Sequence, residues 1–406
     1  MHVLLVSQYF PPEPGATQNR LGAFADGLAV RGHRVTVVCE QPCHPVGAFH
    51  PGYGRRPLVR ERRGSMRLRR LWVAASPRTT TSHRLAFYGS FAVGAGLVCA
   101  MESRPDVALL STPPLPGVLS ATAALTARRI PVVADVRDIW PAAAAALGEL
   151  SNPHLVRLFE RAERWLYRRA ARVTATTRPF CRHVDRVAGF PTSVHLPNGA
   201  LDELVAAPDR KPPRRGPFVV GYAGNLGIAQ GLEIVLDAAE RLRGEHVRFV
   251  LLGDGPLRDW LSLQIAARKL DGAVELRRSV PVSEVGDFLQ SCHALLVPLA
   301  GHPLLADFIP SKLYDAMAVG RPAIVAAAGE ASALVRETGA GVAVPPGSDE
   351  DLAEAVRKLV RSPEEARRMG QAGRTAAARL ARSRQIERLE AVLGLAAGDT
   401  RTAETA

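Results

Sequence analysis

Cysteine, lysine and aromatic residues are all scarce in this chain of 406 residues. Its five cysteines show no paired framework, which excludes a disulfide scaffold and favours a reducing cytosol. Cys39, Cys43 and His44 supply too few ligands for a structural zinc site, so we expect no metal. The apolar run Val3–Val6 follows the first two residues with no basic segment before it, and we therefore expect no secretory leader.

Acidic residues are few relative to basic ones, with 39 Asp and Glu against 52 Lys and Arg and a net charge of +13. Such an excess points to anionic partners. Eight arginines lie between Arg55 and Arg70, opposed only by Glu61. This cluster fits a solvated surface loop or attraction to an anionic membrane. Because no stacking aromatic residues alternate with the arginines, we do not expect a nucleic-acid partner.

A long membrane-spanning run is also missing. Leu85–Met101 has seventeen residues without a charge, but a spanning helix needs about twenty, and this stretch contains three Gly and a Ser. We expect a helix buried in the core. Contact with a membrane surface, next to the arginine cluster, is the alternative.

The order of apolar runs predicts two α/β domains. The chain is too long for one core, and His2–Ser7, a Pro-rich turn, a helix and the strand Arg34–Cys39 form a βαβ unit. The pattern pauses at a Pro-rich, charged segment, 206–217, and restarts at the strand Phe218–Ala223. The helical stretch His154–Ala171 has Leu155 and Leu158 on the side that we expect to face the core. We therefore predict two doubly wound Rossmann-like domains that face each other across a cleft.

The most informative stretch begins at Ala306 and ends at Gly320. Asp307 and Asp315 stand eight residues apart, with Pro310, Ser311 and Lys312 between them. Pro310 fits the start of a helix, whose first turn attracts anions through its N–H groups and dipole. A ligand with hydroxyl groups at both ends and phosphate in the middle, such as a sugar nucleotide, suits this arrangement.

Lys312 is one of only four lysines among the 52 basic residues. A Lys in the first turn of a helix opposes the dipole, at a cost of about 0.3–1 kcal/mol unless an anion binds there. We therefore predict that Lys312 contacts phosphate; a chance exposed Lys is the alternative.

Two glycine-bearing turns follow predicted strands of the second domain. Gly224-Asn225-Leu226-Gly227 lets backbone N–H groups approach a phosphate, although any turn after a strand can carry two glycines. Gly253-Asp254-Gly255 fits a tight turn better, and its glycines also leave room for a nucleoside ring.

In the first domain, Arg137, Asp138 and Trp140 follow a strand. Asp138 can take a proton from an acceptor hydroxyl, or it can form a structural ion pair with Arg137. Three residues after the first strand are further acceptor-side candidates: Tyr9, Glu13 and Gly15.

Together these segments resemble one known family. The stretches 7–15, 136–141, 222–231 and 309–320 are similar to those of retaining glycosyltransferases of family 4, also called glycosyltransferase group 1, which have the GT-B fold. The resemblance is to the bacterial subgroup of N-acetyl-aminodeoxysugar transferases of surface-polysaccharide assembly, and it covers nearly the whole chain.

The resemblance implies roles for the residues of the second domain. Asp307 and Asp315 match two Glu of the family that contact the donor sugar and the ribose, and each is one methylene shorter. Asn225 and Gln230 stand near an Arg and a Lys that grip the diphosphate in many members, which leaves Lys312 to stabilise the leaving phosphate. The expected donor-binding set is Gly224, Asn225, Gly227, Gln230, Gly253, Gly255, Phe308, Ile309, Pro310, Ser311 and Asp315.

We therefore expect an acceptor-side domain at 1–205, a linker at 206–217 and a nucleotide-sugar-binding domain at 218–380. A C-terminal helix at 381–397, able to cross back to the first domain, and a flexible tail at 398–406 follow.

The predicted protein is a cytoplasmic, metal-independent retaining glycosyltransferase of the hexosyltransferase type, without a cofactor, with Asp138, Lys312 and Asp307 as catalytic residues. It uses a UDP-sugar and an acceptor that is a lipid-linked sugar or a small molecule, with peripheral contact at the inner face of an anionic membrane left open. The alternatives are a nucleotide-sugar 2-epimerase of the same fold and a non-catalytic basic protein that binds membranes or nucleic acid.

Overall fold

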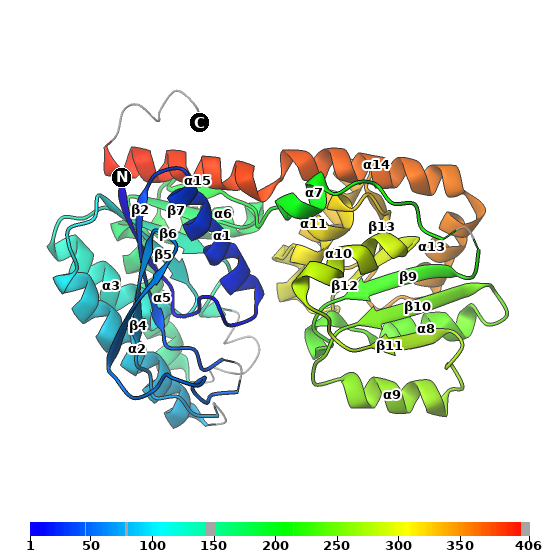
Figure 1. The fold of residues 1–406 in the computed structure, drawn as a ribbon, viewed down its shortest axis with the longest axis horizontal. Helices are drawn as coiled ribbons and strands as arrows, with labels where there is room; N and C mark the ends of the chain where they lie inside the picture. The colour runs from blue at the N-terminus through cyan, green and yellow to red at the C-terminus, as the bar shows by residue number, and fades with distance from the viewer. Residues whose placement is uncertain (45, 78–79, 143–151, 214, 399–406) are drawn as a thin grey trace. The chain divides into compact units, whose positions relative to one another are not determined.

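The computed structural model describes residues 1–44, 46–77, 80–142, 152–213 and 215–398. The chain forms two compact units (Figure 1). Unit 1 comprises Met1–Asn198 and Gln385–Ala406, and unit 2 comprises Gly199–Arg384. Residues 399–406 of the predicted tail lie outside the described residues.

Unit 1 contains one eight-stranded sheet. Its strands are β1 (His2–Val6), β2 (Arg34–Glu40), β3 (Leu58–Arg63), β4 (Met66–Leu71), β5 (Val107–Thr112), β6 (Val132–Val136), β7 (Arg172–Ala175) and β8 (Ser193–His195). They lie in the order β3-β4-β2-β1-β5-β6-β7-β8. All neighbours are parallel except β3 and β4, which form an antiparallel hairpin at the edge. The central strands β1, β5 and β6 are buried throughout, because helices cover both faces.

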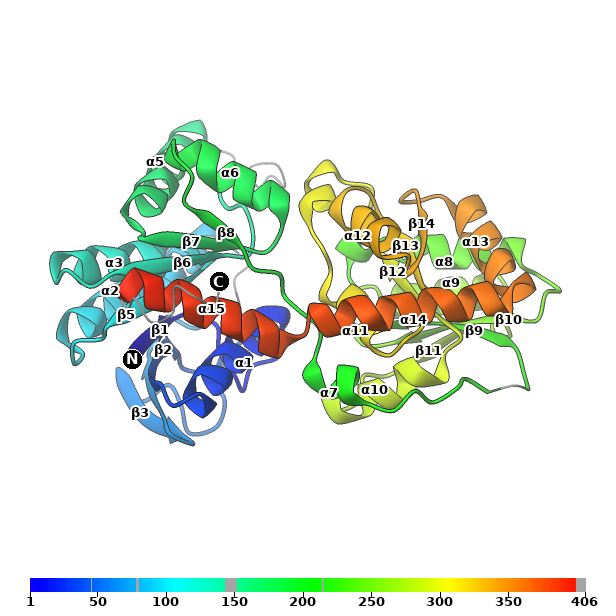
Figure 2. The same ribbon diagram turned by 90° about the horizontal axis from the view of Figure 1, so that it is seen from above.

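The helices of unit 1 form two layers. They are α1 (Ala16–Val30), α2 (Thr81–Met101), α3 (Leu115–Ala127), α5 (Pro153–Arg169), α6 (Arg178–Ala188) and α15 (Arg382–Ala397). Helices α1 and α15 pack on one face of the sheet, where Leu21, Phe24, Leu389 and Leu393 share a core with β1 and β2. Helices α2, α3, α5 and α6 pack side by side in the other layer (Figure 2).

Unit 2 contains a six-stranded, wholly parallel sheet in the order β11-β10-β9-β12-β13-β14. The strands are β9 (Phe218–Ala223), β10 (Val247–Leu252), β11 (Val274–Arg277), β12 (Ala294–Pro298), β13 (Ala323–Ala326) and β14 (Gly341–Val344). Its helical segments are α7 (Asp202–Ala206), η1 (Ile228–Gln230), α8 (Glu233–Arg241), α9 (Arg258–Ala267), α10 (Val282–Ser291), η2 (Pro303–Asp307), α11 (Ser311–Ala318), α12 (Glu330–Thr338), α13 (Asp349–Arg361) and α14 (Pro363–Arg379). One core lies under α8, α9 and α13, and a second lies under α10, α11, α12 and α14.

The arginine cluster is not a loop. Most of Arg55–Arg70 belongs to the β3–β4 hairpin, whose strands the sequence analysis did not predict. Alternation of buried and half-buried residues along β4 is the signal that the high charge obscured.

Two helices are less buried than we expected. Leu155 and Leu158 of α5 are exposed rather than facing the core. Helix α2 buries Phe87, Phe91 and Cys99, but an apolar stripe on its opposite side is exposed. The expectation of a fully buried helix was therefore wrong for α2.

The predicted linker, 206–217, lies within unit 2, which begins at Gly199. Backbone carbonyls of this segment accept hydrogen bonds from unit 2 side chains, as Pro208 does from Gln290 at 3.1 Å. Arg321 also forms an ion pair with Asp209 at 3.1 Å. These contacts attach parts of the segment to unit 2.

Candidate active site

The turns after β9 and β10 meet at the carboxyl edge of the unit 2 sheet, where ligands bind in doubly wound folds. A Cβ atom on Gly253 would lie 1.9 Å from the carbonyl oxygen of Gly224, and one on Gly255 would lie 2.6 Å from Oδ1 of Asn225. Gly224, Gly253 and Gly255 all have φ values between 143° and 158°. These glycines therefore let the two turns pack against each other, in agreement with the tight-turn interpretation of Gly253 and Gly255.

Lys312 points at the turn after β9. Its Nζ donates a hydrogen bond to Oη of Tyr222 at 2.8 Å and lies 4.2 Å from the centre of the Tyr222 ring. Oη of Tyr222 in turn donates to the carbonyl oxygen of Asn225 at 2.6 Å. A Cβ atom on Gly224 would be 3.3 Å from this Nζ. The ammonium group is thus held at the backbone of the glycine turn.

Burial affects the charge of Lys312 strongly. Desolvation lowers the pKa of its ammonium group to about 7, and the nearby carboxylate of Asp315 opposes that shift. Desolvation also raises the pKa of Asp315 to about 6, with Arg382 and Lys312 acting in the opposite direction. A bound anion would stabilise the charged form of Lys312 and so oppose the effect of desolvation on its pKa.

Helix α11 begins directly after Pro310, which is its N-cap and provides no side-chain cap. Ser311 and Lys312 therefore lie in its first turn, as predicted. Phe308 and Ile309 lead into the helix from η2, and both are half-buried. This helix start combines exposed amide dipoles with the ammonium group of Lys312, which is the chemistry of a phosphate site.

The two carboxylates of the segment differ in environment. Asp307 ends η2 and is exposed, whereas Asp315 lies within α11 and is half-buried. The loop after β13 supports η2, because a Cβ atom on Gly329 would lie 2.0 Å from the carbonyl oxygen of Ala306.

Gln230 has a structural partner. Its Oε1 accepts a hydrogen bond from the N–H of Gly227 at 3.2 Å and closes the short turn η1. A Cβ atom on Gly227 would collide with Asn225 and Gln230. The carboxamide of Gln230 thus shapes the turn in addition to any role toward a ligand.

The acceptor-side candidates lie in unit 1, after β1 and β6. Oε1 of Glu13 accepts hydrogen bonds from the backbone N–H groups of Cys43 and His44, both at 2.8 Å. Glu13 is buried, and desolvation raises the pKa of its carboxyl group despite these two bonds. The ring of Tyr9 packs against His44 at 5.3 Å. Glu13 thus holds a loop of unit 1 with a buried carboxylate, and its acceptor-side role stays a prediction.

Gly15 occupies the N-cap position of α1 with φ 148°. A Cβ atom there would lie 2.3 Å from Oε1 of Gln18. This glycine is required by the entry into α1.

Glu13, Glu40 and Cys43 form the one group of potential metal ligands found among the described residues, with ligand atoms within 4.8 Å of one another. Gln8 donates to Glu40 at 2.9 Å, and the thiol of Cys43 lies 3.7 Å from Glu40. Because these hydrogen bonds and those of Glu13 already join the loops after β1 and β2, we assign the group a structural role.

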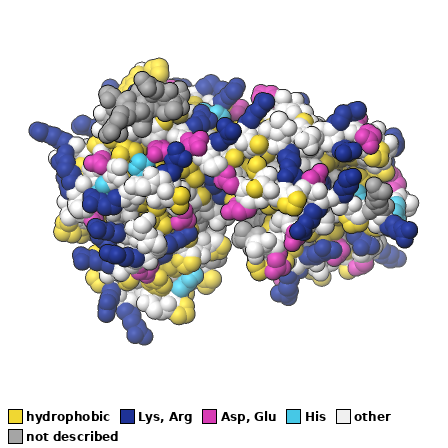
Figure 3. Space-filling view, turned by 45° about the horizontal axis from the view of Figure 1, so that its top comes forward, with side chains coloured by type: hydrophobic (Ala, Val, Ile, Leu, Met, Phe, Trp, Pro, Cys, Tyr) yellow, Lys and Arg dark blue, Asp and Glu magenta, His cyan; other side chains and the backbone are white. Residues whose placement is uncertain are grey.

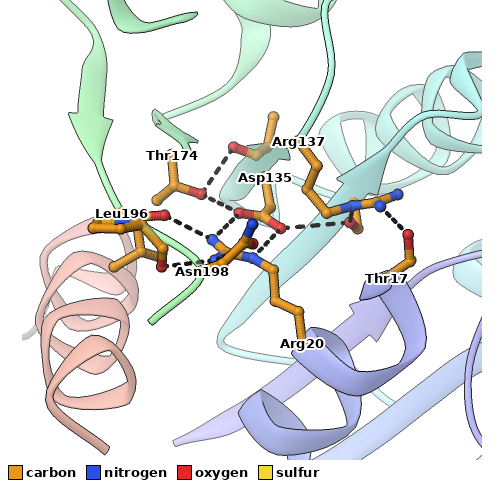
Figure 4. A network of polar contacts seen from close by, with 10 residues as sticks. Thr17, Arg20, Asp135, Arg137, Thr174, Leu196 and Asn198 are labelled. Carbon is orange, nitrogen blue, oxygen red and sulfur yellow. Dashed lines mark hydrogen bonds and ion pairs between the residues drawn. The ribbon is translucent and has the colours of Figure 1, made fainter. Parts of the chain in front are cut away.

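Arg137 is tightly fixed at the end of β6. It donates to Oγ of Ser111 at 2.8 Å, to the carbonyl oxygen of Pro113 at 2.6 Å and to Oγ1 of Thr17 (Figure 4). Burial lowers the pKa of its guanidinium group to about 10. These three partners position the segment that carries Asp138.

Trp140 lies in the same segment. Its backbone N–H donates to the carbonyl oxygen of Asp138 at 3.1 Å, and its ring meets the ring of Phe159 of α5 edge to face, with 4.7 Å between the ring centres. Both Asp138 and Trp140 are half-buried, and Oδ1 of Asp138 is buried.

A buried ion pair that the sequence analysis missed lies behind these residues. Arg20 of α1 donates to both carboxylate oxygens of Asp135, at 2.9 and 3.3 Å, and both residues are fully buried (Figure 4). Arg20 also donates to the carbonyl oxygens of Leu196 and Pro197. Thr174 donates to Asp135 at 2.8 Å. A charged residue within the otherwise apolar strand 132–136 is the signal that could have revealed this pair.

Solved structures define the class of this fold. Sucrose-phosphate synthase (tll1590) from Thermosynechococcus elongatus superposes with a TM-score of 0.71 at 16% identity, over 97% of this chain and 99% of that one. Anabaena Alr3699/HepE in complex with UDP and glucose superposes with a TM-score of 0.68 at 16% identity, over 97% and 98%. The fold is therefore GT-B, with two Rossmann-like units, as predicted.

Sequence models define the family. The model described as "Glycosyl transferase 4-like domain" matches residues 15–199, and "Glycosyl transferases group 1" matches residues 207–376. Together they cover most of both units, and the chain belongs to the group 1 glycosyl transferases.

Named relatives agree with this family. The "Putative colanic acid biosynthesis glycosyl transferase WcaI" of Escherichia coli (strain K12) is 27% identical over 396 residues, 89% of this chain and 93% of its own length. "Alpha-D-kanosaminyltransferase" of Streptomyces kanamyceticus is 29% identical over 157 residues, 38% of this chain and 39% of its own. The chain is thus a glycosyltransferase, similar to bacterial glycosyltransferases that include one of colanic acid biosynthesis.

Proposed function

We propose that this glycosyltransferase moves a hexose-type sugar from a UDP-sugar to an acceptor hydroxyl with retention of anomeric configuration and without a metal. The observation that carries the proposal is the position of Lys312, in the first turn of α11 and against the glycine turn after β9. A neighbour of the same fold binds UDP and glucose, which makes a uridine diphosphate the first donor to test.

In the proposed reaction, the bond between C1 of the sugar and the diphosphate oxygen breaks, and negative charge develops on the leaving group. Lys312 and the amide dipoles at the start of α11 stabilise that charge. The acceptor oxygen forms its bond to C1 on the same face. We assign the proton of the acceptor hydroxyl to Asp138 and orientation of its segment to Arg137.

We assign separate residues to the sugar, the ribose and the diphosphate of the donor. Asp307 accepts hydrogen bonds from sugar hydroxyls, and its exposure leaves it accessible to them. Asp315 accepts from the ribose. Ser311 and the turn Gly224–Asn225 hold the diphosphate beside Lys312.

The decisive experiment screens UDP-, dTDP- and GDP-sugars by thermal shift and then follows turnover of the hits. We expect a UDP-sugar to raise the melting temperature and the product to keep the anomeric configuration of the donor, as read by NMR. Excess EDTA should leave the rate unchanged. An inverted product would contradict the proposal, and a donor epimerised without acceptor would identify a 2-epimerase instead. Failure of every nucleotide sugar to bind would favour a non-catalytic protein.

Asp138→Asn tests the acceptor side separately. The substitution should lower the transfer rate and leave UDP-sugar affinity unchanged, since the donor contacts are assigned to unit 2. Weaker UDP-sugar binding in this variant would show that Asp138 has a structural role.

The acceptor class is proposed as a lipid-linked sugar or a small molecule, met in the cytoplasm. Short synthetic acceptors of both kinds, supplied to the same enzyme in detergent-free buffer, distinguish them by rate.

A further inference from the structure

Helix α2 presents an apolar stripe to solvent. Leu85, Val93, Leu97 and Met101 are 63%, 65%, 56% and 75% exposed. Their spacing of four or eight residues places them on one side of the helix. Large apolar side chains that are exposed in a contiguous row usually mark an interaction surface.

The opposite side of α2 is fixed inside unit 1. Phe87, Phe91 and Cys99 are buried at 1% exposure or less, and Phe91 packs against Gly117 of α3. Helices α2 and α3 lie side by side in both ribbon views (Figures 1 and 2). Ser82–Met101 is long and apolar enough to cross a membrane, yet its buried side belongs to the core of unit 1. The stripe can therefore lie on a membrane but not span it.

The β3–β4 hairpin provides positive charge next to α2. Leu71 of β4 contacts Gly94 of α2, and Arg69 binds Glu102 at the end of α2 at 2.6 Å. Side chains alternate along a strand, so Arg67 shares this face of the sheet with Arg69 and Leu71. The antiparallel register pairs Arg60 with Arg69 and Arg62 with Arg67, which brings both onto the same face.

The guanidinium groups of Arg60, Arg62 and Arg67 have no hydrogen bond or ion pair within the part of the chain that the structure describes. By contrast, Arg63 points to the other face and pairs with Asp26 of α1. The face with the apolar stripe therefore carries uncompensated positive charge. On the surface seen in Figure 3, Lys and Arg side chains outnumber the acidic ones and are interspersed with them.

We propose that the stripe of α2 and the three arginines Arg60, Arg62 and Arg67 form a docking surface for an anionic lipid bilayer. The apolar side chains enter the interface between headgroups and acyl chains, and the guanidinium groups bind lipid phosphates beside them. The occupant follows from charge complementarity, since an apolar protein partner would leave the three positive charges unpaired. This surface brings unit 1, with its acceptor-side residues, to a lipid-linked acceptor, a consequence that rests on the proposed function.

The test is co-sedimentation of the full chain with vesicles of phosphatidylcholine alone or with one part in three phosphatidylglycerol. We expect binding to the anionic vesicles that weakens as salt rises, because exposed charges are screened. Arg60→Ala/Arg62→Ala/Arg67→Ala should lower the partition coefficient on the order of 100-fold, from a factor of about five for each basic residue near the surface.

The stripe is tested by Val93→Asn/Leu97→Asn, which should lower binding at least tenfold at every salt concentration. Matched controls remove the same groups elsewhere on the surface, in unit 2. Leu263→Asn/Val360→Asn changes two exposed apolar residues, and Arg367→Ala/Arg368→Ala/Arg379→Ala removes three exposed arginines. Both controls should bind the anionic vesicles like the unaltered protein.

Four results would overturn the proposal. The first is absence of binding to the anionic vesicles, and the second is an equal loss in the control with three arginines replaced. The third is retention of binding by Val93→Asn/Leu97→Asn, which would indicate a site for soluble polyanions such as nucleic acid. A dimer in sedimentation velocity that this variant dissociates would assign the stripe to a second copy of the chain. Donor binding, measured on every variant, should stay unchanged and separates this result from any failure of the proposed chemistry.

Discussion

At the scale of single residues, the ammonium group of Lys312 is positioned before any ligand binds. The hydroxyl of Tyr222 accepts its hydrogen bond, the Tyr222 ring lies beneath it, and Gly224 leaves space beside it. Such preorganisation is what electrostatic stabilisation of a leaving group requires.

Lys312→Ala should lower kcat/KM by roughly 30- to 1000-fold, corresponding to about 2–4 kcal/mol of transition-state stabilisation. The measurement is steady-state kinetics with the donor identified in the screen. Lys211→Ala, which changes an exposed lysine, is the matched control and should retain full activity. An unchanged kcat/KM in Lys312→Ala would remove this residue from the mechanism.

Donor affinity should be greatest between about pH 6 and pH 7. Above the pKa of Lys312, about 7, the free protein must take up a proton to bind the diphosphate, and the association constant falls by up to tenfold per pH unit. Below the pKa of Asp315, about 6, the ribose contact loses its negative charge. Calorimetric titration with a UDP-sugar measures both limbs. In Lys312→Ala, the decrease of donor affinity above about pH 7 should disappear and the decrease below about pH 6 should remain. If the decrease above pH 7 remains in this variant, a group other than Lys312 causes it.

Tyr222→Phe should lower kcat/KM about tenfold, because Lys312 loses the hydroxyl that holds it. The sequence analysis gave Tyr222 no role. If Tyr222 acts through Lys312, the double variant Tyr222→Phe/Lys312→Ala should be no slower than Lys312→Ala. Additive losses would instead show an independent effect. Tyr53→Phe, which removes a hydroxyl bound to Glu61 in unit 1, is the control.

Individual residues of the candidate site could be selected from the sequence only where their type was unusual for its position. Lys312 was predicted because lysine is rare in this chain and unfavourable at the start of a helix. Arg20 and Asp135 were not, because their partners are separated by 115 positions in sequence and meet only in the folded unit. Glu13 was placed on the acceptor side by its loop, but its two backbone bonds require a folded second loop.

At the scale of elements, the Arg20–Asp135 pair joins α1, β6 and the segment after β8 that contains Leu196 and Pro197. Burial alone would raise the pKa of Asp135, but the guanidinium group of Arg20 holds it below its usual value. A charged pair of this kind contributes little net stability, yet either partner alone is costly to keep buried.

Arg20→Ala should lower the free energy of unfolding by about 3–5 kcal/mol, since it leaves the carboxylate of Asp135 buried without its cation. Guanidinium chloride denaturation measures the loss. Arg63→Ala breaks an exposed pair between α1 and the hairpin and should cost no more than about 1 kcal/mol. If the two substitutions lower the free energy of unfolding equally, the difference in burial between the two ion pairs does not determine the loss.

The strands differ in how readily the sequence predicts them. Short apolar runs predicted β1, β2, β6, β9 and β10, because strands buried on both faces are continuously apolar. The hairpin β3–β4 was missed because arginines occupy both of its faces. Only pairing of β4 with β2 shows that Met66 and Leu68 belong to the core.

At the scale of the whole molecule, helix α15, near the C-terminus, forms part of the core of unit 1. Ile386, Leu389 and Leu393 of α15 pack in the same core as Val3, from the first strand. His33 also lies 2.7 Å from Glu390 of α15.

Leu393→Ala should destabilise the protein by about 2–5 kcal/mol, because it leaves a cavity in the core of unit 1. Leu395→Ala, two residues later on the exposed side of α15, should change stability by less than about 1 kcal/mol. Thermal and chemical denaturation of the two variants provide the comparison. A similar small loss in both would show that α15 is not an integral part of unit 1.

The sequence by itself determined the two α/β units, the family and the start of α11 at which we propose the anion site, because each depends on local periodicity and on residue types within one segment. The tertiary structure decided which candidate residues lie beside that helix start and which are held by contacts within the fold. It brought Tyr222 under Lys312 and drew Glu13 into the interior of unit 1, and it left one side of α2 exposed. These outcomes depend on burial and on contacts between distant segments, and neither is a property of any stretch of sequence alone.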